Sequence, residues 1–360
     1  MSSLSAYSIR PEYLKQLNEA GFVAANDLNG VDPVDLSREA NIPRDEALKI
    51  IKAVRKKASN ERKIESQTAL EIFQRERLAI GIVSFSEKID EIIGNGVPLG
   101  KITELCGSPG VGKTQMCMQL AIDVQFPPVF GGLDGEAFYI DTEGGFVLER
   151  VTQIAKAAQQ HLRNVARVSN EPDQEAAASR LTPEYFLSRI YHVKCVNYAE
   201  VLAHVNLLGE FLQEHPKIKL VVIDSVAFPF RQDFDDFATR TRILNGMAQT
   251  LIEVATKHNL AIVLTNHLTT RFNRDSVTKT TSSSLQPALG ESWGHACTIR
   301  ILLLWEETGG RLATLYKSPN KQRNSARYQI TTDGVRDIPD GDGKDGDEHP
   351  AKRRREIESV

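Results

Sequence analysis

The stretch that decides the fold reads ELCGSPGVGKTQMCMQL and spans residues 104–120. Its centre fits the pattern GxxxxGK[ST], with an apolar run before it and an amphipathic helical pattern after it. Glycines in such a loop let the backbone wrap around phosphates, and amide groups at the helix N-terminus add partial positive charge. Both flanks therefore predict a phosphate-binding loop rather than a chance glycine turn.

The motif gives its residues specific roles toward a bound nucleotide. Lys113 is expected to reach the β- and γ-phosphates, and the Thr114 hydroxyl is expected to ligate Mg²⁺. The predicted cofactors are therefore ATP and Mg²⁺. The residues of the loop predicted to bind the nucleotide are Gly107, Ser108, Pro109, Gly110, Val111, Gly112, Lys113, Thr114 and Gln115.

Around this loop, apolar runs alternate with amphipathic segments between residues 80 and 338. The runs expected to form strands are residues 101–107, 137–143, 189–195, 219–225, 260–266 and 298–305. Helices are expected between them, for example over 198–215 and 242–258. This alternation predicts an α/β fold with a mainly parallel sheet covered by helices.

Composition divides the chain into four parts. Residues 1–58 carry apolar positions at helical spacing and predict a small all-helical domain. Residues 59–79 are rich in charge and are expected to be a linker, and residues 80–338 form the α/β core. Residues 339–360 have almost no apolar side chains and predict a disordered tail.

The two ends of the chain suggest partners. Two short helices around a turn at 41–43 can form a helix-hairpin-helix whose loop amides meet a phosphate backbone. A small helical bundle that contacts another protein is an equally supported interpretation. The basic run at 352–355 is of the kind that import receptors bind, so the predicted location is the nucleus, with some protein in the cytoplasm.

The overall composition excludes several classes of protein. A hydrophobic fraction of 41% with 25% charged residues is typical of a globular chain. No apolar run reaches the roughly 18 residues of a membrane span, and no apolar signal core is seen at the N-terminus. The four cysteines are scattered and predict reduced, buried thiols. With a net charge of −3, any surface that binds nucleic acid must be local.

Two carboxylates are candidates for the chemistry at this loop. Asp224 ends the run KLVVID, where it can hold the Mg²⁺ water shell, and Ser225 follows it as a possible helper. Glu143 lies in AFYIDTEGGF and could orient and deprotonate an attacking water, while Asp141 and Thr142 shape the turn. Spacing alone leaves Glu143 evenly divided between a catalytic base and a structural turn residue.

Six stretches together resemble the eukaryotic RecA-type recombinases and their paralogues, the Rad51 group. They are GSPGVGKTQMCMQL (107–120), YIDTEGGF (139–146), LVVIDS (220–225), LTNHLTTR (264–271), PALGESWGHACTIRI (287–301) and RLATLYKSPN (311–320). The resemblance covers roughly residues 10–338 and implies a RecA-like P-loop ATPase core that acts in homologous recombination and double-strand break repair. It supports Glu143 as the water-activating carboxylate and implies that Arg150 lies near the adenine.

The resemblance also implies partners. They are DNA, mainly single-stranded DNA or recombination intermediates, and related paralogues in a hetero-oligomer. DNA-facing loops are expected after residues 223–231 and after residues 264–270. The basic residues predicted to bind DNA there are Arg231, Arg240, Arg271, Arg274 and Lys279. Three aspartates offset the arginines of the first loop, so it is expected to bind DNA weakly or to need a partner.

At several positions the sequence departs from the family pattern. The polar sensor after the strand at 260–266 is usually Gln but here is His267, the third predicted catalytic residue beside Glu143 and Lys113. Ser66 replaces the aromatic anchor of the self-assembly motif, which favours hetero-assembly over long homo-filaments. Asn41 replaces the glycine of the helix-hairpin-helix turn, which weakens the case for DNA binding by residues 1–58.

Two hypotheses from different classes are consistent with these residues. The first is a Mg²⁺-dependent, DNA-dependent ATPase, with strong or weak hydrolysis, whose ATP state controls DNA and partner binding at subunit interfaces. The second is an ATP-binding scaffold or adaptor subunit of a paralogue complex, with little hydrolysis of its own. Both use the same ATP-site residues, so the sequence alone does not separate them.

Overall fold

The computed structural model describes residues 4, 9–23, 25–28, 31–61, 68–78, 80–232, 234, 236–274 and 281–339. The chain forms two compact units, residues 1–77 and residues 78–360, which are described separately. Ser66 and residues 340–360 of the predicted tail (339–360) lie outside the described residues. Among the described residues, none of the helices combines the length and the apolar composition that a membrane span requires.

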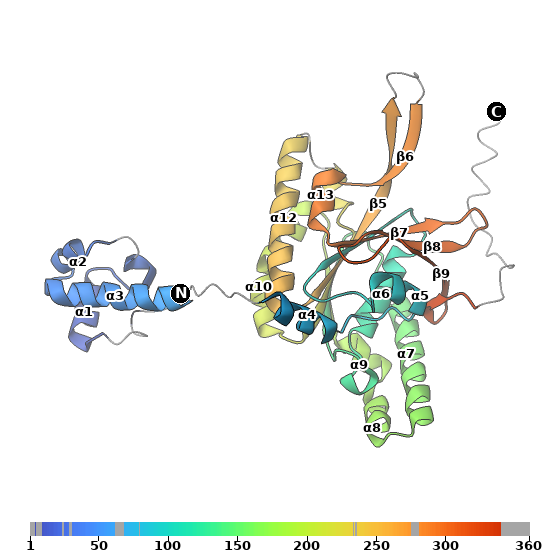
Figure 1. The fold of residues 1–360 in the computed structure, drawn as a ribbon, viewed down its shortest axis with the longest axis horizontal. Helices are drawn as coiled ribbons and strands as arrows, with labels where there is room; N and C mark the ends of the chain where they lie inside the picture. Colours follow the sequence, from blue (N-terminus) through green and yellow to red (C-terminus); the bar gives the residue numbers. More distant parts are fainter. Residues whose placement is uncertain are drawn as a thin grey trace. The chain divides into compact units, whose positions relative to one another are not determined.

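The first unit is a small helical domain (Figure 1). Its elements are α1 (Pro11–Glu19), the 3₁₀ helix η2 (Ala25–Leu28), α2 (Pro33–Glu39) and α3 (Arg44–Glu61), and α4 (Ala69–Leu78) follows. Leu17, Leu36 and Ile51 are among the buried side chains of its core. Asn41 adopts a left-handed backbone with φ of 53°. Because asparagine tolerates this region better than other non-glycine residues, the turn between α2 and α3 forms without the expected glycine.

The second unit is built on a ten-stranded sheet, counted over the described residues. Its strands are β1 (Ile102–Gly107), β2 (Glu136–Asp141), β3 (Ile190–Lys194), β4 (Ile218–Asp224), β5 (Ala261–Arg274), β6 (Thr281–Pro287), β7 (Ile299–Trp305), β8 (Arg311–Lys317), β9 (Ser325–Thr331) and β10 (Gly334–Asp337). The order is β10-β9-β8-β7-β1-β5-β4-β2-β3, with β6 paired to β5. The pairs from β7 through β1, β5, β4 and β2 to β3 are parallel, whereas β7 to β10 form an antiparallel extension.

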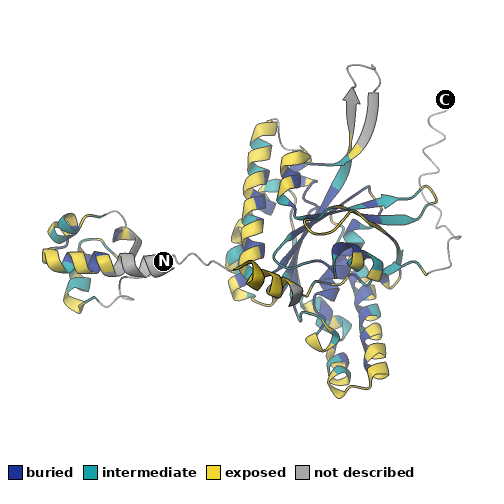
Figure 2. Ribbon diagram, viewed as in Figure 1, coloured by how far each residue is buried: buried dark blue, intermediate teal, exposed yellow. Residues whose placement is uncertain are grey.

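Helices cover both faces of this sheet (Figure 1). The helices of this unit are α5 (Glu87–Ile93), α6 (Lys113–Asp123), η3 (Pro128–Phe130), α7 (Leu148–Ser169), α8 (Pro172–Arg180), α9 (Pro183–Ser188), α10 (Tyr198–Glu214), α11 (Pro229–Gln232), α12 (Phe237–His258) and α13 (Gly290–Ala296), and α8 packs against α7 and η3. Alternate strand residues face opposite sides, so Val222 packs with α5 and α6 while Val221 packs with α10 and α12. Figure 2 shows the buried residues gathered along the sheet between these layers. The prediction of a RecA-like α/β fold is confirmed.

Each of the six predicted strands overlaps an observed strand.

The prediction that the two DNA-facing segments are loops is wrong, because both contain regular secondary structure. Residues 268–274 of β5 pair antiparallel with residues 281–287 of β6 and form a hairpin. The other segment is largely helical, because α12 already begins at Phe237. The Asp236 carboxylate caps this helix by accepting hydrogen bonds from the amides of Ala238 and Thr239, at 2.9 and 3.1 Å. Arg240 therefore lies on a helix.

A buried charged cluster links four elements of the core. The Glu104 side chain on β1 is fully buried. Its carboxylate accepts hydrogen bonds from Asn266 Nδ2 and Trp293 Nε1, both at 2.8 Å, and from Arg300 Nε. A buried carboxylate is tolerated only when it is paired and hydrogen-bonded. These contacts therefore fix β5, α13 and β7 against the strand that carries the P-loop.

Asp90 on α5 is another carboxylate of this unit, and it is only partly buried. Both of its oxygens accept a hydrogen bond from the Ser84 amide at 3.0 Å. Burial raises the pKa of Asp90 to about 6, and the negative charge of Asp337 acts in the same direction. The folded chain therefore holds a proton on Asp90 more tightly than the unfolded chain, whose aspartate pKa is roughly 3.9.

We expect Asp90→Asn to flatten the pH dependence of stability between about pH 4 and pH 6. In the wild type, the free energy of unfolding falls as the pH rises through this window, by up to about 1.4 kcal/mol per pH unit from this group. Urea denaturation at several pH values measures the slope. Asp173→Asn, at an exposed aspartate of α8, is the matched control. Equal slopes for wild type and Asp90→Asn would contradict the assignment.

Candidate active site

A cleft of about 680 Å³ opens at the carboxyl ends of the parallel strands, where α/β sheets bind ligands. The P-loop, the turn after β2, and the ends of β4 and β5 contribute to it, together with the antiparallel strands β8 and β9. Its lining residues are Pro109, Gly110, Gly112, Lys113, Thr114, Gln115, Glu143, Gly145, Arg150, Asp224, His267, Arg311, Ile330, Thr331 and Thr332. Ligand sites of 300–1,000 Å³ are common, so a nucleotide fits this volume.

The P-loop conformation depends on glycine. Gly112 has φ of +113°, and a Cβ atom there would lie 2.3 Å from Ile330 Cδ1. A Cβ atom on Gly107 would lie 2.6 Å from the Leu303 carbonyl oxygen. Gly112 is also the N-cap of α6 and has no side chain to cap the helix. The first amides of α6 can therefore bind an anion, as the motif predicts.

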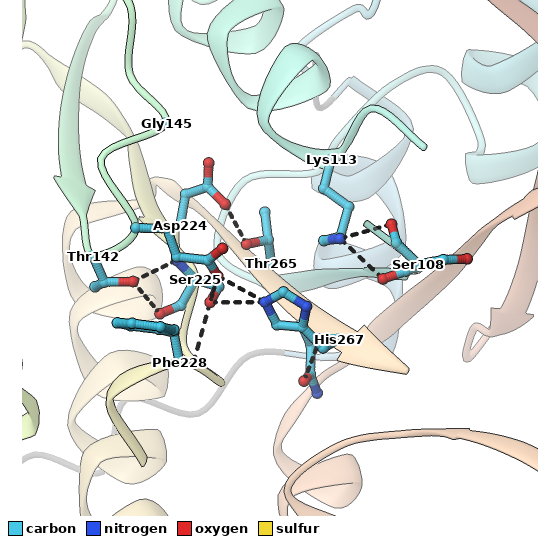
Figure 3. Close-up of polar contacts among 12 residues, drawn as sticks. Ser108, Lys113, Thr142, Gly145, Asp224, Ser225, Phe228, Thr265 and His267 are labelled. Atoms are coloured by element: carbon cyan, nitrogen blue, oxygen red, sulfur yellow. Dashed lines mark hydrogen bonds and ion pairs between the residues drawn. The ribbon is translucent and has the colours of Figure 1, made fainter. Parts of the chain in front are cut away.

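Lys113 supplies a buried cation beside this loop (Figure 3). Its ammonium group donates hydrogen bonds to the carbonyl oxygens of Gly107 and Ser108, at 2.9 and 3.1 Å. Burial lowers the pKa of Lys113, and the negative charges of Asp224 and Glu143 oppose that shift. Phosphate oxygens are suitable acceptors for the same ammonium group, since a hydrogen bond between charged partners is stronger than one to a neutral carbonyl.

Asp224 presents a carboxylate near Thr114 at the end of β4. It accepts hydrogen bonds from Tyr139 Oη at 2.8 Å and from the Thr265 hydroxyl. Burial raises the pKa of Asp224, while hydrogen bonds from Thr265, Thr114 and Tyr139 oppose the rise. A hard cation such as Mg²⁺ prefers oxygen ligands and needs only one or two from the protein when phosphates complete its shell. Thr114 and Asp224 fit that donor set.

Asp141 builds the turn that holds Glu143. Its carboxylate accepts hydrogen bonds from four successive backbone amides, residues 143–146, at 2.8–3.2 Å. Thr142 contributes as predicted, since its hydroxyl bonds the carbonyl and amide of Ser225 at 2.8 and 2.7 Å. The side chain of Glu143 takes no part in closing the turn, so its carboxylate can line the cleft.

Glu143 and His267 meet directly inside the cleft. His267 Nε2 lies 2.7 Å from Glu143 Oε1, and the Ser225 hydroxyl donates to the same oxygen. The hydrogen bond from His267 lowers the pKa of Glu143, burial opposes this, and the bond from Ser225 lowers it further. Figure 3 shows the imidazole of His267 pointing toward Ser225. All three predicted catalytic residues therefore line one cleft.

Arg150 lies on α7 at the cleft wall. Its guanidinium donates to Gln115 Oε1 at 2.7 Å and to the carbonyl oxygens of Thr331 and Thr332 at 2.6 Å. Val111 differs from the other P-loop residues, because its side chain is buried in the core and its carbonyl accepts from Tyr328 at 2.9 Å. Any contact of Val111 with a nucleotide is therefore through its backbone.

The predicted DNA-binding residues are only partly described. Arg271 and Arg274 lie on β5 of the hairpin, and Lys279 is outside the described residues. Arg231 is exposed at the end of α11. Arg240 Nε is buried with no hydrogen-bond partner among the described residues. Burial, followed by the positive charge of Arg231, lowers the pKa of Arg240, so the two guanidinium groups repel each other.

Sequence reasoning missed several residues of the site. Tyr139 could have been predicted, because it lies two residues before Asp141 on β2 and its side chain therefore faces the same side of the sheet. Of the cleft residues on β8 and β9, Arg311 begins the family stretch at 311–320, which assigns it no role, and Ile330 lies in none of the quoted stretches. Their strands are antiparallel additions whose place beside the P-loop follows only from tertiary pairing.

The fold and the cleft define the class of protein, an α/β P-loop protein of the RecA-like type. A family model described as Rad51 matches residues 74–176 and 173–338. The chain is 43% identical over 366 residues to the DNA repair protein RAD51 homolog 3 of Cricetulus griseus, which covers 99% of this chain and 98% of that protein. It is 39% identical over 257 residues to the protein of the same name from Dictyostelium discoideum, covering 71% of this chain and 65% of that protein.

The chain therefore belongs to the Rad51 family, which confirms the resemblance seen in the sequence. The same stretches also predict a C-type paralogue of the group, and the matches to two RAD51 homolog 3 proteins confirm that prediction.

Proposed function

We propose that this chain binds ATP with Mg²⁺, hydrolyses it slowly in a DNA-dependent manner, and acts in homologous recombination and double-strand break repair. The observation that carries the proposal is the convergence of Lys113, Thr114, Asp224 and Glu143 on one cleft at the N-terminus of α6. Both relatives are DNA repair proteins by name, which supports the cellular role.

In this proposal each side chain has a separate task. The P-loop amides and Lys113 bind and orient the phosphates, and Thr114 and Asp224 hold the metal ion. Bound Mg²⁺ neutralises charge on the β- and γ-phosphate oxygens. The lowered pKa of Glu143 keeps its carboxylate ionised at neutral pH, so it can accept a hydrogen bond from a water and orient it toward the γ-phosphate.

A second candidate function is an ATP-binding scaffold with little hydrolysis. One observation favours it: Glu143 Oε1 already receives hydrogen bonds from both His267 and Ser225. A water must compete with these donors for the carboxylate, which reduces the catalytic contribution of Glu143. In either case the partners we propose are related paralogues in a hetero-oligomer, as the sequence difference at Ser66 favours.

DNA is the proposed polymer partner, and the β5–β6 hairpin is its proposed contact. Arg271 and Arg274 lie on the strand that leaves the cleft directly after His267. The basic run at 352–355 supports a proposed location in the nucleus, with some protein in the cytoplasm.

We expect Glu143→Gln to reduce ATP hydrolysis by about 100-fold or more while leaving ATP binding within about threefold of wild type. The amide keeps the size of the side chain but cannot take a proton. Single-turnover hydrolysis with and without single-stranded DNA measures the effect. Glu149→Gln, at an exposed glutamate in the first turn of α7, is the control. A wild type that DNA does not stimulate, combined with an unchanged rate in Glu143→Gln, favours the scaffold.

Replacing both Arg271 and Arg274 by Ala should weaken DNA binding and reduce the slope of log affinity against log salt by about 2. Each arginine that neutralises a phosphate releases about one counterion, so losing two contacts removes about two units of slope. Fluorescence anisotropy with labelled single-stranded DNA at several salt concentrations gives the slope. An unchanged slope would show that the hairpin does not contact the phosphates.

A further inference from the structure

Arg311 is a cleft residue to which neither the sequence motifs nor the relatives assign a role. It is the first residue of β8 and lies opposite Trp305 of β7 and Tyr328 of β9 in the antiparallel extension. Its side chain lines the same cleft as the P-loop. A cation thus lies on the wall formed by β8 and β9, separate from Lys113 on α6.

The guanidinium of Arg311 is held in place but is not neutralised. Its Cζ lies 4.5 Å from the ring centroid of Trp305, a cation–π geometry. No carboxylate forms an ion pair with it among the described residues, and its Nε atom is buried without a hydrogen-bond partner there. On the next strand, by contrast, Arg327 is paired with Glu306 at 3.0 Å. The guanidinium charge therefore has no anionic partner among the described residues, and its side chain lines the cleft where a ligand anion can supply one.

The neighbouring contacts indicate which part of a nucleotide this cation faces. Tyr328 Oη donates to the Val111 carbonyl at 2.9 Å, and Ile330 packs against Gly112. These contacts place β9, the neighbour of β8, against the tip of the P-loop. The backbone amides of that tip are the groups that cradle the α- and β-phosphates in such loops, whereas the lysine reaches the β- and γ-phosphates.

We propose that Arg311 is a nucleotide-binding residue that contacts the α- or β-phosphate of ATP or ADP from the β8 side of the cleft. This inference rests on the proposed function, since it needs the cleft to bind a nucleotide. A planar guanidinium held on an indole is pre-ordered for two parallel hydrogen bonds to phosphate oxygens. ADP carries both the α- and the β-phosphate. Arg311 therefore stabilises the complex with the product ADP as well as the complex with ATP.

The test measures the affinity of the full chain for Mg·ATP, Mg·ADP and adenosine by calorimetry or by competition with a fluorescent nucleotide. Arg311→Met keeps an unbranched apolar stem over Trp305 and removes the charge, and Arg311→Lys keeps a charge. We expect Arg311→Met to weaken ATP and ADP binding at least tenfold with adenosine unchanged, and Arg311→Lys to recover part of the loss. Arg327→Met, on β9 and outside the cleft, should bind all three like wild type.

The intrinsic fluorescence of the indole gives an independent readout. The chain has two tryptophans, and the other one, Trp293, is buried in the core. If a phosphate of the nucleotide binds the guanidinium that lies over Trp305, ADP should change the tryptophan emission of the wild type but not that of Arg311→Met. If Arg311 had a purely structural role, Arg311→Met would lower the melting temperature of the nucleotide-free chain and would weaken the binding of adenosine as much as the binding of ATP.

Three results would overturn the inference. They are wild-type affinity for ATP and ADP in Arg311→Met, an equal loss for adenosine, or the same loss in Arg327→Met. A wild-type chain that binds neither ATP nor ADP is a different failure, because it refutes the proposed function itself and removes the ligand on which the role of Arg311 depends.

Discussion

The arrangement of the core depends on the buried carboxylate of Glu104. It has no access to water, and its hydrogen bonds come from Asn266 on β5, Trp293 on α13 and Arg300 on β7. Removing one partner of a buried ion pair costs about 3–5 kcal/mol, so the folded state requires these elements together. Asn266 also accepts a hydrogen bond from the amide of His267 at 2.8 Å. The same cluster that fixes the central strands thus positions a residue of the cleft.

The cluster also reaches the base of the β5–β6 hairpin. Asn266 Nδ2 donates to the Ala288 carbonyl at 2.9 Å, and the Ala288 amide donates to the carbonyl of His267 at 2.8 Å. One end of the hairpin therefore continues from His267 along the chain, and the other end is hydrogen-bonded to it. A ligand that moves the Glu143–His267 contact acts on the residue directly before the paired part of the hairpin, which begins at Leu268. The geometry supports the proposal that the nucleotide and DNA affect each other's binding, because the two proposed sites share one short strand segment.

Much of this arrangement could be predicted from the sequence, because strong local patterns specify it. The stretch 104–120 determines a strand, a glycine turn and a helix, and an apolar strand ending in Asp224 predicts a carboxylate at the same sheet edge. The rest depends on tertiary pairing of strands, or on a side chain whose local hydrogen bonds give it a role other than the one that its charge suggests. By its charge alone Asp236 opposes DNA binding, yet its carboxylate caps α12, and half of the expected loop is helix. Arg311 could not be found, since nothing in its sequence neighbourhood indicates that β8 lies beside the P-loop.

The central claim is that this cleft binds Mg·ATP through the P-loop and its lysine. Calorimetric titration of the purified full chain with Mg·ATP, beside Lys113→Ala, tests it most directly. The account predicts one ATP per chain, with affinity at least tenfold weaker in Lys113→Ala, since a charge-assisted contact to phosphate contributes about 1.5–3 kcal/mol. It also predicts weaker binding when Mg²⁺ is removed. Equal affinity in the two proteins, or no ATP binding by the wild type at millimolar concentration, would contradict it.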